Sequence, residues 1–332
     1  AALASWVAVF LLDDLIYYWV HRKSHEVNIL WAGHVVHHSS EEYNLSVALR
    51  QSSLHGLLTW IFYLPLALLG VPVVMWAICH ALNLIYQFWI HTRGVRRLPR
   101  MLEAVLNTPS HHRVHHGVNP QYQDRNYAGV FIVWDRLFGT FEPEVEEPVY
   151  GITKPLASWN PVWANVHVFA EIGRDARAAA GWRDRLQIVF GHPGWKPASL
   201  GPSSVPQPVS AATFLKFEPP VPASLRTYGF IQFVIALVAA LALLARASTL
   251  PTGQVFAAVF YLTLTLGNIG AILEGRSWAA VSEVARLTVL AVACGVLIAL
   301  GRGPVEWLAA ALALAIGSIC AVLWLRPRFA MA

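Results

Sequence analysis

The sequence predicts an all-α protein, a polytopic membrane bundle of helices with a histidine-rich di-metal cap on its cytoplasmic side. Of its 332 residues 56% are hydrophobic and only 13% are charged, whereas charged residues make up about 25% of an average soluble domain. Apolar runs at 230–245, 255–273 and 305–325 approach the ~20 residues that a membrane-spanning helix needs. A soluble helical enzyme with a large core is the alternative, and uninterrupted runs of this length argue against it.

Seven long helices are expected from these runs and from the glycines and prolines between them. Their ranges are 3–20, 54–69, 72–90, 228–245, 254–273, 285–301 and 304–325. The second and third are expected to form a hairpin that turns at Gly70 and Pro72, because glycine ends helices and proline begins them. This hairpin would bring His55 and His91 to the same side of the membrane.

Composition divides the chain into three regions. Residues 1–205 are predicted to form a membrane catalytic domain with its cap, 206–227 a proline-rich connector, and 228–332 a C-terminal group of spans. Arginines and lysines flank the first three expected helices, and the positive-inside rule places such residues in the cytoplasm. The cap is therefore predicted to be cytoplasmic. Because the sequence begins with Ala1 and not with Met, spans upstream of it are left open.

Several other classes of function find no support in the sequence. The formal net charge is +5, but the basic residues form no single stripe of the kind that binds nucleic acid. Cys79, Cys294 and Cys320 lie in apolar runs without CxxC spacing, so neither disulfides nor a zinc ribbon is indicated. No glycine-rich phosphate loop is present.

The strongest signal is the clustering of histidine. Nine of the 14 histidines fall in three boxes: His21-Arg-Lys-Ser-His25, His34-Val-Val-His37-His38 and His111-His112-Arg-Val-His115-His116. Residues three and four apart share one face of a helix, so each box can direct two or three imidazoles to one point. Imidazole binds iron, zinc, copper and nickel, and so many imidazoles exceed what one ion can coordinate. The boxes therefore predict two metal ions.

His91 is a further candidate ligand because it follows an apolar helix and emerges where the boxes lie. His111 precedes an otherwise complete HxxHH box, so it either binds the metal or supports the histidines that do. The predicted metal ligands are His21, His25, His34, His37, His38, His91, His111, His112, His115 and His116. The isolated His80, His167 and His192 are expected to be ordinary structural residues. His55 is left open as either a metal ligand or a structural residue.

Metal-bound histidines need a partner for their second ring nitrogen, usually a carboxylate or a carbonyl. Asp14, Tyr18, His21 and His25 are spaced to lie on one helical stripe. A carboxylate within a span is costly unless it is paired, so Asp14 is the preferred outer partner. Further candidates are Glu26, Glu41, Asp124 and Asp135. An ordinary solvated charge is the alternative for each of them, and above all for Glu41 and Glu42.

These residues together resemble the fatty acid hydroxylase or sterol desaturase superfamily, whose signature is the series HxxxH, HxxHH, HxxHH. The short sequence motifs between and after the boxes are similar to those of the alkylglycerol monooxygenase branch of that superfamily. They include Trp31-Ala-Gly-His34, Tyr43-Asn44-Leu, Tyr86-Gln-Phe-Trp-Ile-His91, Asn107-Thr-Pro-Ser, Asn126-Tyr-Ala-Gly-Val130 and Trp134-Asp135. One departure is Gln87, where some members of the superfamily carry a further ligand histidine.

The resemblance implies a catalytic site that also contains Asn107 and Tyr127. It further implies two iron ions that use O2 to oxidise a lipid drawn from the bilayer, with tetrahydrobiopterin as the reductant. The oxidised carbon would be the one next to the ether oxygen of an alkylglycerol, and the products a fatty aldehyde and a glycerol derivative. The polar headgroup is expected to rest against Arg22, Arg50 or Arg113.

Two other functions stay open at this point. One is a desaturase or hydroxylase of sterols, carotenoids or acyl lipids, which would use the same metals with an electron-donor protein. The other is a metal transporter, but a transporter would carry its histidines along a pore, whereas these boxes gather at one end of the spans.

Overall fold

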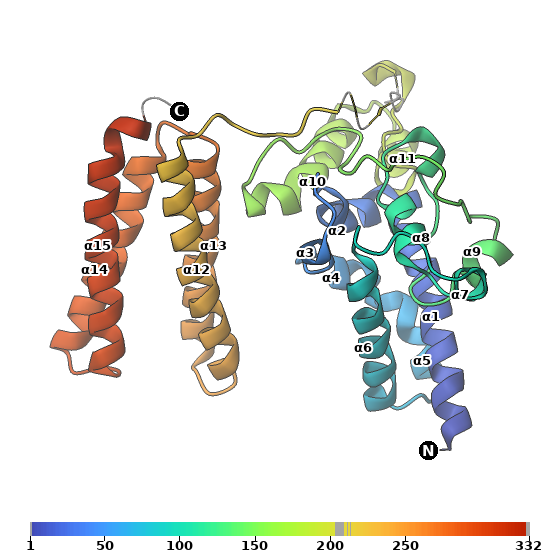
Figure 1. Cartoon of the computed structure of the whole chain (residues 1–332), viewed down its shortest axis with the longest axis horizontal. Helices are drawn as coiled ribbons and strands as arrows, with labels where there is room; N and C mark the ends of the chain where they lie inside the picture. Colours follow the sequence, from blue (N-terminus) through green and yellow to red (C-terminus); the bar gives the residue numbers. More distant parts are fainter. Residues whose placement is uncertain (1, 203–208, 211, 213, 330–332) are drawn as a thin grey trace. The chain divides into compact units, whose positions relative to one another are not determined.

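The computed structural model describes residues 2–202, 209–210, 212 and 214–329 (Figure 1). Within these residues every regular element is a helix, and the one β contact is an isolated bridge between Gly117 and Tyr150. The all-α prediction is confirmed. The chain forms two compact units, the first of Ala1–Leu156 with Asn165–Lys216 and the second of Ala157–Ala164 with Phe217–Ala332. The connector predicted at 206–227 includes residues 206–208, 211 and 213, which lie outside the described part of the chain.

Two long helices carry the apolar part of unit 1. The helix α1 spans Leu3–Glu26 and packs against α6, Val73–Ile90. It runs six residues beyond its predicted end, because Glu26 forms ion pairs with Arg22 and Lys23 one turn earlier, and such pairs support a helix. This last turn carries His21 and His25.

The segment predicted as one helix at 54–69 is broken, and that prediction was wrong. It consists of α4 (His55–Thr59), the 3₁₀ turn η1 (Trp60–Tyr63) and α5 (Leu64–Leu68). Pro65 has no amide hydrogen to donate to the preceding turn, so a regular helix cannot pass through this position. The turn before α6 contains Gly70 with a φ of 76°, a conformation that glycine adopts without strain.

Shorter helices build the rest of unit 1. They are α2 (Asn28–His38), α3 (Leu45–Ala48), α7 (Arg100–Val105), α8 (Pro109–His115), η2 (Pro120–Tyr122), α9 (Val133–Leu137), α11 (Trp182–Phe190) and η3 (Ala198–Leu200). The helix α10, Pro161–Ala178, begins in the segment assigned to unit 2. The end of α11 is tied to the start of α2, because the Asn28 amide donates to Gly191 O and its side chain to Ile188 O.

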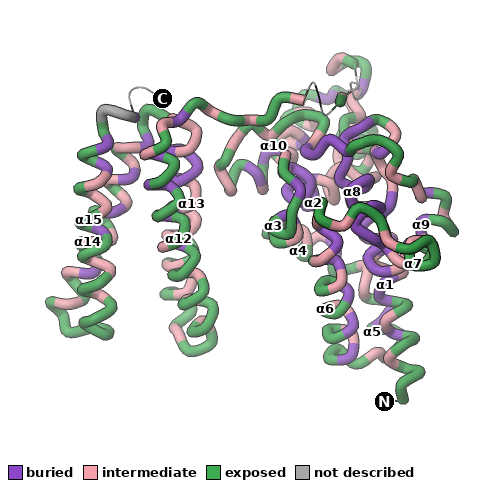
Figure 2. The backbone as a smooth tube through the Cα atoms, viewed as in Figure 1, coloured by how far each residue is buried: buried purple, intermediate pink, exposed green. Residues whose placement is uncertain are grey.

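Unit 2 is a group of four helices: α12 (Ala223–Arg246), α13 (Thr252–Leu273), α14 (Ala279–Ala299) and α15 (Val305–Phe329). Many large apolar side chains on them are exposed, such as Phe230, Phe260 and Trp324. Figure 2 shows that much of the length of these helices is exposed. Six helices among the described residues, α1, α6 and these four, are long and apolar enough to cross a membrane. Apolar exposure on this scale is expected when lipid, and not water, surrounds the helices.

A buried ionic network joins three helices of unit 2. The Glu283 carboxylate accepts hydrogen bonds from Arg286 at 2.6 and 2.9 Å and from the Tyr228 hydroxyl at 2.7 Å. The Arg286 guanidinium also donates to Tyr261 and Gln232. Ionisable side chains inside a bundle of spans are costly unless their hydrogen bonds are satisfied. Here α12, α13 and α14 supply these partners.

Candidate metal centre

The ends of four helices bring the histidine boxes together. His21 and His25 lie on the last turn of α1, and His34, His37 and His38 on the second half of α2. His91 directly follows α6, while His112, His115 and His116 lie on or just after α8. None of these nine side chains is more than 8% exposed. The sequence had selected all nine as candidate ligands, eight by their spacing in the boxes and His91 by its place after an apolar helix.

The nine histidines form two groups. The five-histidine group consists of His21, His25, His34, His38 and His115. The four-histidine group consists of His37, His91, His112 and His116. Within each group the candidate ligand atoms all lie within 4.8 Å of one another. Each group therefore has the number and closeness of nitrogen donors that one metal ion requires.

Each HxxHH box contributes to both groups. His34 and His38, one turn apart on α2, join the five-histidine group, whereas His37 joins the other. In the same way His115 belongs to a different group from His112 and His116. Consecutive residues on a helix point about 100° apart, so the histidine doublets face two ways. Two imidazoles of each HxxHH box, His34 with His38 and His112 with His116, thus converge on one group, whereas His37 and His115 face the other.

The two groups touch through a ring contact. The rings of His38 and His116 stack with their centroids 4.4 Å apart and their planes at 21°. The His37 ring lies 4.6 Å from that of His116 within the four-histidine group. The two candidate metal positions are thus neighbours.

Backbone carbonyls orient four of the rings. The Nδ1 atoms of His21 and His115 lie 2.7 and 2.9 Å from Tyr127 O and Arg125 O. Those of His91 and His37 lie 2.7 and 3.3 Å from Gln87 O and Arg50 O. A carbonyl can only accept a hydrogen bond, so Nδ1 must carry the proton in each ring. The Nε2 atoms of these rings then present lone pairs to the interior of the groups.

The Nε2 atoms crowd together in both groups. They are 3.0 Å apart for His21 and His34, 3.2 Å for His38 and His115, and 2.9 Å for His91 and His112. His91 faces His37 at 3.3 Å, although carbonyls hold the Nδ1 protons of both rings. Two unprotonated nitrogens at this distance repel each other unless a cation lies between them. The arrangement fits bound metal ions.

The protonation of these histidines also suits metal binding. Burial in apolar surroundings lowers the pKa of His34, His38 and His115 well below the ordinary range, and lowers that of His91 to about 4. At neutral pH these imidazoles are therefore uncharged. A histidine must be neutral to act as a metal ligand.

Asp14 is not placed beside a histidine. Its fully buried carboxylate accepts hydrogen bonds from the amides of Val130 and Phe131, the Trp134 indole and the Asn83 side chain. Although Asp14 and His21 share one helical stripe, seven residues separate them by about 10 Å along the axis. The structure thus gives Asp14 a role in joining the segment 130–134 to α1 and α6.

Three other predicted residues frame the centre through the backbone. Asp135 accepts hydrogen bonds from the amides of Tyr127 and Ala128, each at 2.8 Å. The buried Asn107 side chain donates to Ala128 O at 2.6 Å. The Tyr127 carbonyl orients His21, and the Tyr127 ring packs 5.3 Å from that of His25. These residues therefore hold the segment 127–128 against the five-histidine group.

Asp124 is the carboxylate that lies beside a box histidine. Its Oδ1 atom is 3.7 Å from His25 Nδ1, and its Oδ2 atom is 3.3 Å from His192 Nε2. The interaction with Asp124 raises the pKa of His192. His192, which was expected to be an ordinary structural residue, reaches Asp124 because α11 is joined to the start of α2.

A cavity of about 450 Å³ opens next to this pair of residues. Its walls include Arg22, Glu26, Asp124, Tyr127 and His192. Glu26 faces the cavity and forms its ion pairs with Arg22 and Lys23, so it contacts no box histidine within the described residues. Glu41, another predicted site residue, lies next to Gly151. A Cβ atom added to Gly151 would be 3.5 Å from the Cγ atom of Glu41.

Replacing Asp124 with asparagine is expected to weaken metal binding by about 10-fold to 100-fold, as loss of an outer partner usually does. Competition with a chelator, followed through the metal content of purified protein, measures this effect. Glu42→Gln is the matched control, because Glu42 is exposed and pairs with Lys216. Equal metal affinities of the two variants would contradict the role of Asp124.

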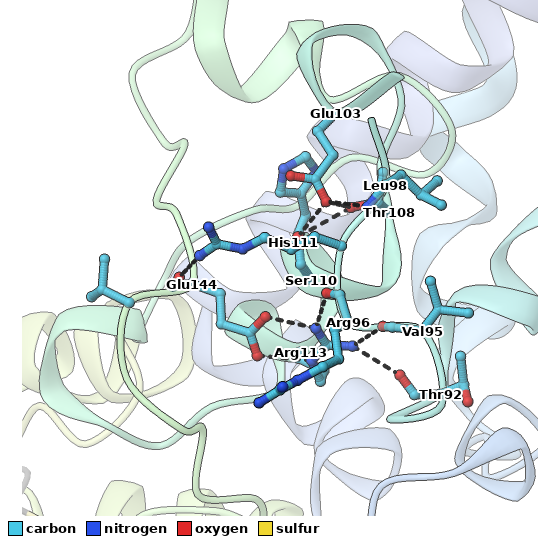
Figure 3. A network of polar contacts seen from close by, with 12 residues as sticks. Thr92, Val95, Arg96, Leu98, Glu103, Thr108, Ser110, His111, Arg113 and Glu144 are labelled. Atoms are coloured by element: carbon cyan, nitrogen blue, oxygen red, sulfur yellow. Dashed lines mark hydrogen bonds and ion pairs between the residues drawn. The ribbon is translucent and has the colours of Figure 1, made fainter. Parts of the chain in front are cut away.

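His111 lies outside both groups. It precedes His112 on α8, so its ring points away from the centre and lies 5.3 Å from that of Phe141. Its Nδ1 atom is buried without a hydrogen-bond partner among the described residues. The structure thus separates His111 from the nine other candidate ligands, on the side where Glu103 lies (Figure 3).

Arg113 was wrongly expected to meet a lipid headgroup. It forms a bidentate ion pair with Glu144, with distances of 2.8 and 2.6 Å, and donates to the carbonyls of Thr92, Val95 and Arg96 (Figure 3). A guanidinium with all these partners is engaged within the protein. Arg113 therefore holds the loop that follows His91.

The sequence did not single out Tyr43 as a site residue. Its hydroxyl donates to Ile90 O, and its ring lies 5.3 Å from that of His116 and stacks on Tyr150 at 4.7 Å. Its place in the motif Tyr43-Asn44-Leu, one of those that carry the family resemblance, was the available signal. His55 lies near the five-histidine group, with its ring 5.1 Å from that of His34.

Comparison with known proteins agrees with this geometry. The family model described as fatty acid hydroxylase matches residues 6–140, and the one described as alkylglycerol monooxygenase C-terminal domain matches residues 225–302. Alkylglycerol monooxygenase of Homo sapiens is 43% identical over 284 residues, which are 85% of this chain and 63% of that protein. The Danio rerio protein of the same name is 41% identical over 290 residues, 86% of this chain and 64% of that protein.

A more distant relative is the ornithine lipid hydroxylase OlsE of Rhizobium tropici, 30% identical over 42% of this chain and 43% of that protein. No solved structure matches the chain. The chain spans 63% of the length of the human alkylglycerol monooxygenase.

Proposed function

Because the chain belongs to the fatty acid hydroxylase superfamily and is homologous to alkylglycerol monooxygenases over most of its length, we propose that it is a membrane-bound oxygenase that hydroxylates a lipid C–H bond. The bond is the one on the ether-linked carbon of an alkylglycerol. One atom of O2 enters this bond, and the other leaves as water with two electrons and two protons from a reductant. The hydroxylated carbon is a hemiacetal, which collapses to a fatty aldehyde and a glycerol derivative.

The observation that carries this proposal is the pair of buried groups of neutral imidazoles. We assign one iron ion to the five-histidine group and a second to the four-histidine group. Bound iron supplies the activation of O2. Within the described residues each group offers imidazole donors and no carboxylate, a ligand set suited to a first-row transition metal.

The side chains and carbonyls around the groups prepare the site for this chemistry. The carbonyls of Tyr127, Arg125 and Gln87 hold the rings of His21, His115 and His91 in one tautomer. The rings of Tyr43 and Tyr127 shield the histidines from water. A dry, prepared site favours reaction with a lipid tail over side reactions with solvent.

The reductant is proposed to be tetrahydrobiopterin, and an electron-donor protein is the alternative. The deciding experiment supplies purified protein in lipid nanodiscs with an alkylglycerol, O2 and reduced pterin, and traps the released fatty aldehyde. A second series offers sterols, carotenoids and acyl lipids with a ferredoxin-type donor. Product only in the second series would replace the proposal by a different hydroxylase or desaturase. Metal uptake into proteoliposomes without any oxidised lipid would favour a transporter.

We further propose that the metal centre faces the cytoplasm, which the exposed Arg93, Arg96 and Arg97 beyond His91 support. A cysteine at Arg93, in a Cys320→Ser background, is expected to react with an impermeant maleimide only after the cells are opened. A cysteine at Leu69, in the exposed turn at the other end of α6, is the matched control and should react in intact cells. The reverse pattern would contradict this orientation.

A further inference from the structure

Two short helices of unit 1 expose an apolar surface beside the metal centre. On α7 the exposed side chains are those of Met101, Leu102 and Val105, and on α9 those of Val133 and Leu137. Met101 is 85% and Leu137 67% exposed. A hydrogen bond from Arg136 to Glu103 O joins the two helices. We call these five apolar side chains the α7–α9 surface.

This surface lies where the exposed part of α1 ends. The Trp134 indole of α9 donates to Asp14 at 2.9 Å, and the Phe131 ring lies 6.2 Å from that of Phe10. Large apolar side chains of α1 are exposed up to Leu12, and from Asp13 onwards the helix is covered. The surface is therefore continuous with the lipid-facing part of a candidate span. This is the level at which an amphipathic segment meets the headgroup region of a bilayer.

A basic cavity of about 360 Å³ adjoins the apolar side chains. Its walls contain Arg97, Arg100 and Arg136. Arg97 and Arg136 donate to backbone carbonyls, which carry no net charge. Among the described residues no carboxylate forms an ion pair with any of the three. Three neighbouring guanidinium groups that form no direct ion pair favour an anion with several oxygens, such as a phosphate.

The two glutamates of this cavity offset only part of the charge of the arginines. The Glu144 carboxylate is already bound by Arg113 in a bidentate ion pair. Glu103 accepts hydrogen bonds from the Leu98 amide and the Ser110 hydroxyl (Figure 3). Glu103 therefore keeps its negative charge, whereas Glu144 is neutralised by Arg113, so the three arginines outnumber the one unpaired carboxylate of the cavity.

We propose that the α7–α9 surface docks on anionic phospholipid. Its apolar side chains enter the outer part of the acyl chains, while Arg97, Arg100 and Arg136 hold the lipid phosphate. The proposal rests on the spans of unit 1 and is independent of the oxidation reaction. It adds a lipid-binding site to the protein, on the side of the centre where His111 and the His91 loop lie.

The depth of the surface can be measured by spin labelling. Cysteines at Met101 and Leu137, in a Cys320→Ser background, are labelled with a nitroxide, and the protein is placed in nanodiscs of phosphatidylcholine and phosphatidylglycerol. The expected result is relaxation by O2 and protection from a water-soluble nickel complex at both positions. The matched control is Val145, which is 70% exposed in the same unit but lies outside the surface. Labels at 101 and 137 that are as accessible to nickel as the label at 145 would overturn the proposal.

The charge of the site is tested with the double variant Arg97→Gln/Arg100→Gln. Native mass spectrometry is expected to show that its preference for phosphatidylglycerol over phosphatidylcholine falls by about 10-fold to 30-fold, since each arginine near a membrane surface contributes to the attraction for anionic lipid. The control is Arg183→Gln/Arg185→Gln on the exposed face of α11, which should leave the preference unchanged. An equal preference in both double variants would overturn the phosphate site. Short distances between labels of two molecules in one nanodisc would instead identify a second copy as the partner.

Discussion

Replacing His38 with alanine is expected to abolish lipid oxidation and to remove the metal ion from the five-histidine group. The Nε2 atom of His38 lies 3.2 Å from that of His25, 3.1 Å from that of His34 and 3.2 Å from that of His115. No other imidazole has so many neighbours of this kind in the described structure. The loss of activity should exceed the ~10-fold to 100-fold effect of an outer residue. Metal analysis and aldehyde release from an alkylglycerol measure the two effects.

A matched control is His80→Gln. His80 lies on α6, well before His91, and hydrogen-bonds Asp13, and glutamine keeps a hydrogen-bond donor. This variant should retain the metal and the activity. Detergent-extracted yield and melting temperature establish that both variants are folded. A folded His38→Ala protein that still binds a full complement of metal and releases aldehyde would refute the assignment of the centre.

The second large effect is expected in unit 2. Replacing Glu283 with alanine should destabilise the bundle by about 3–5 kcal/mol, because it leaves the buried Arg286 charge without its partner. The hydroxyl of Tyr228 would lose its acceptor as well. A melting curve of unit 2 in detergent, followed by far-UV circular dichroism, measures the loss.

The double variant Glu283→Ala/Arg286→Leu separates the unpaired charge from the lost packing. It should recover much of the stability, since replacing a whole buried pair by apolar side chains is often nearly neutral. As a control, Thr288→Ala removes a polar group from the exposed face of the same helix and should change little. If the single and double variants had the same melting temperature, the stability of the bundle would not depend on the ion pair.

Much of the fold was predictable because the driving pattern is local. Runs of apolar residues bounded by glycine or proline identified α6, α12, α13, α14 and α15, although α12 and α14 begin five and six residues earlier than predicted. Two predicted helices were wrong for local reasons. The ion pairs of Glu26 extend α1 beyond its predicted end, and Pro65, which has no amide hydrogen, interrupts the helix predicted at 54–69.

The site was predictable where it depends on side-chain type and not where it depends on packing. Histidine is distinctive, so spacing identified eight of the nine residues of the two groups, and the apolar helix before His91 indicated the ninth. The groups that orient their rings are carbonyls, such as Tyr127 O and Arg125 O, and every residue has a carbonyl. Asp14 could be placed on the correct face of α1, but its partners come from residues 130–134, far away in the sequence. The contact of His192 with Asp124 likewise depends on the docking of α11.

The histidine doublets have a consequence for how the protein acquires its metals. His37 and His38 are neighbours on one helix yet serve different groups, as do His115 and His116. An ion in the five-histidine group would order α2 and α8, and with them the backbone that presents His37, His112 and His116. The first ion would then bear the entropy cost of ordering these helix ends, and the second ion would bind to helix ends that are already ordered. If the chain binds two iron ions as proposed, we expect loading to be positively cooperative and a chain that holds a single ion to be a minor species.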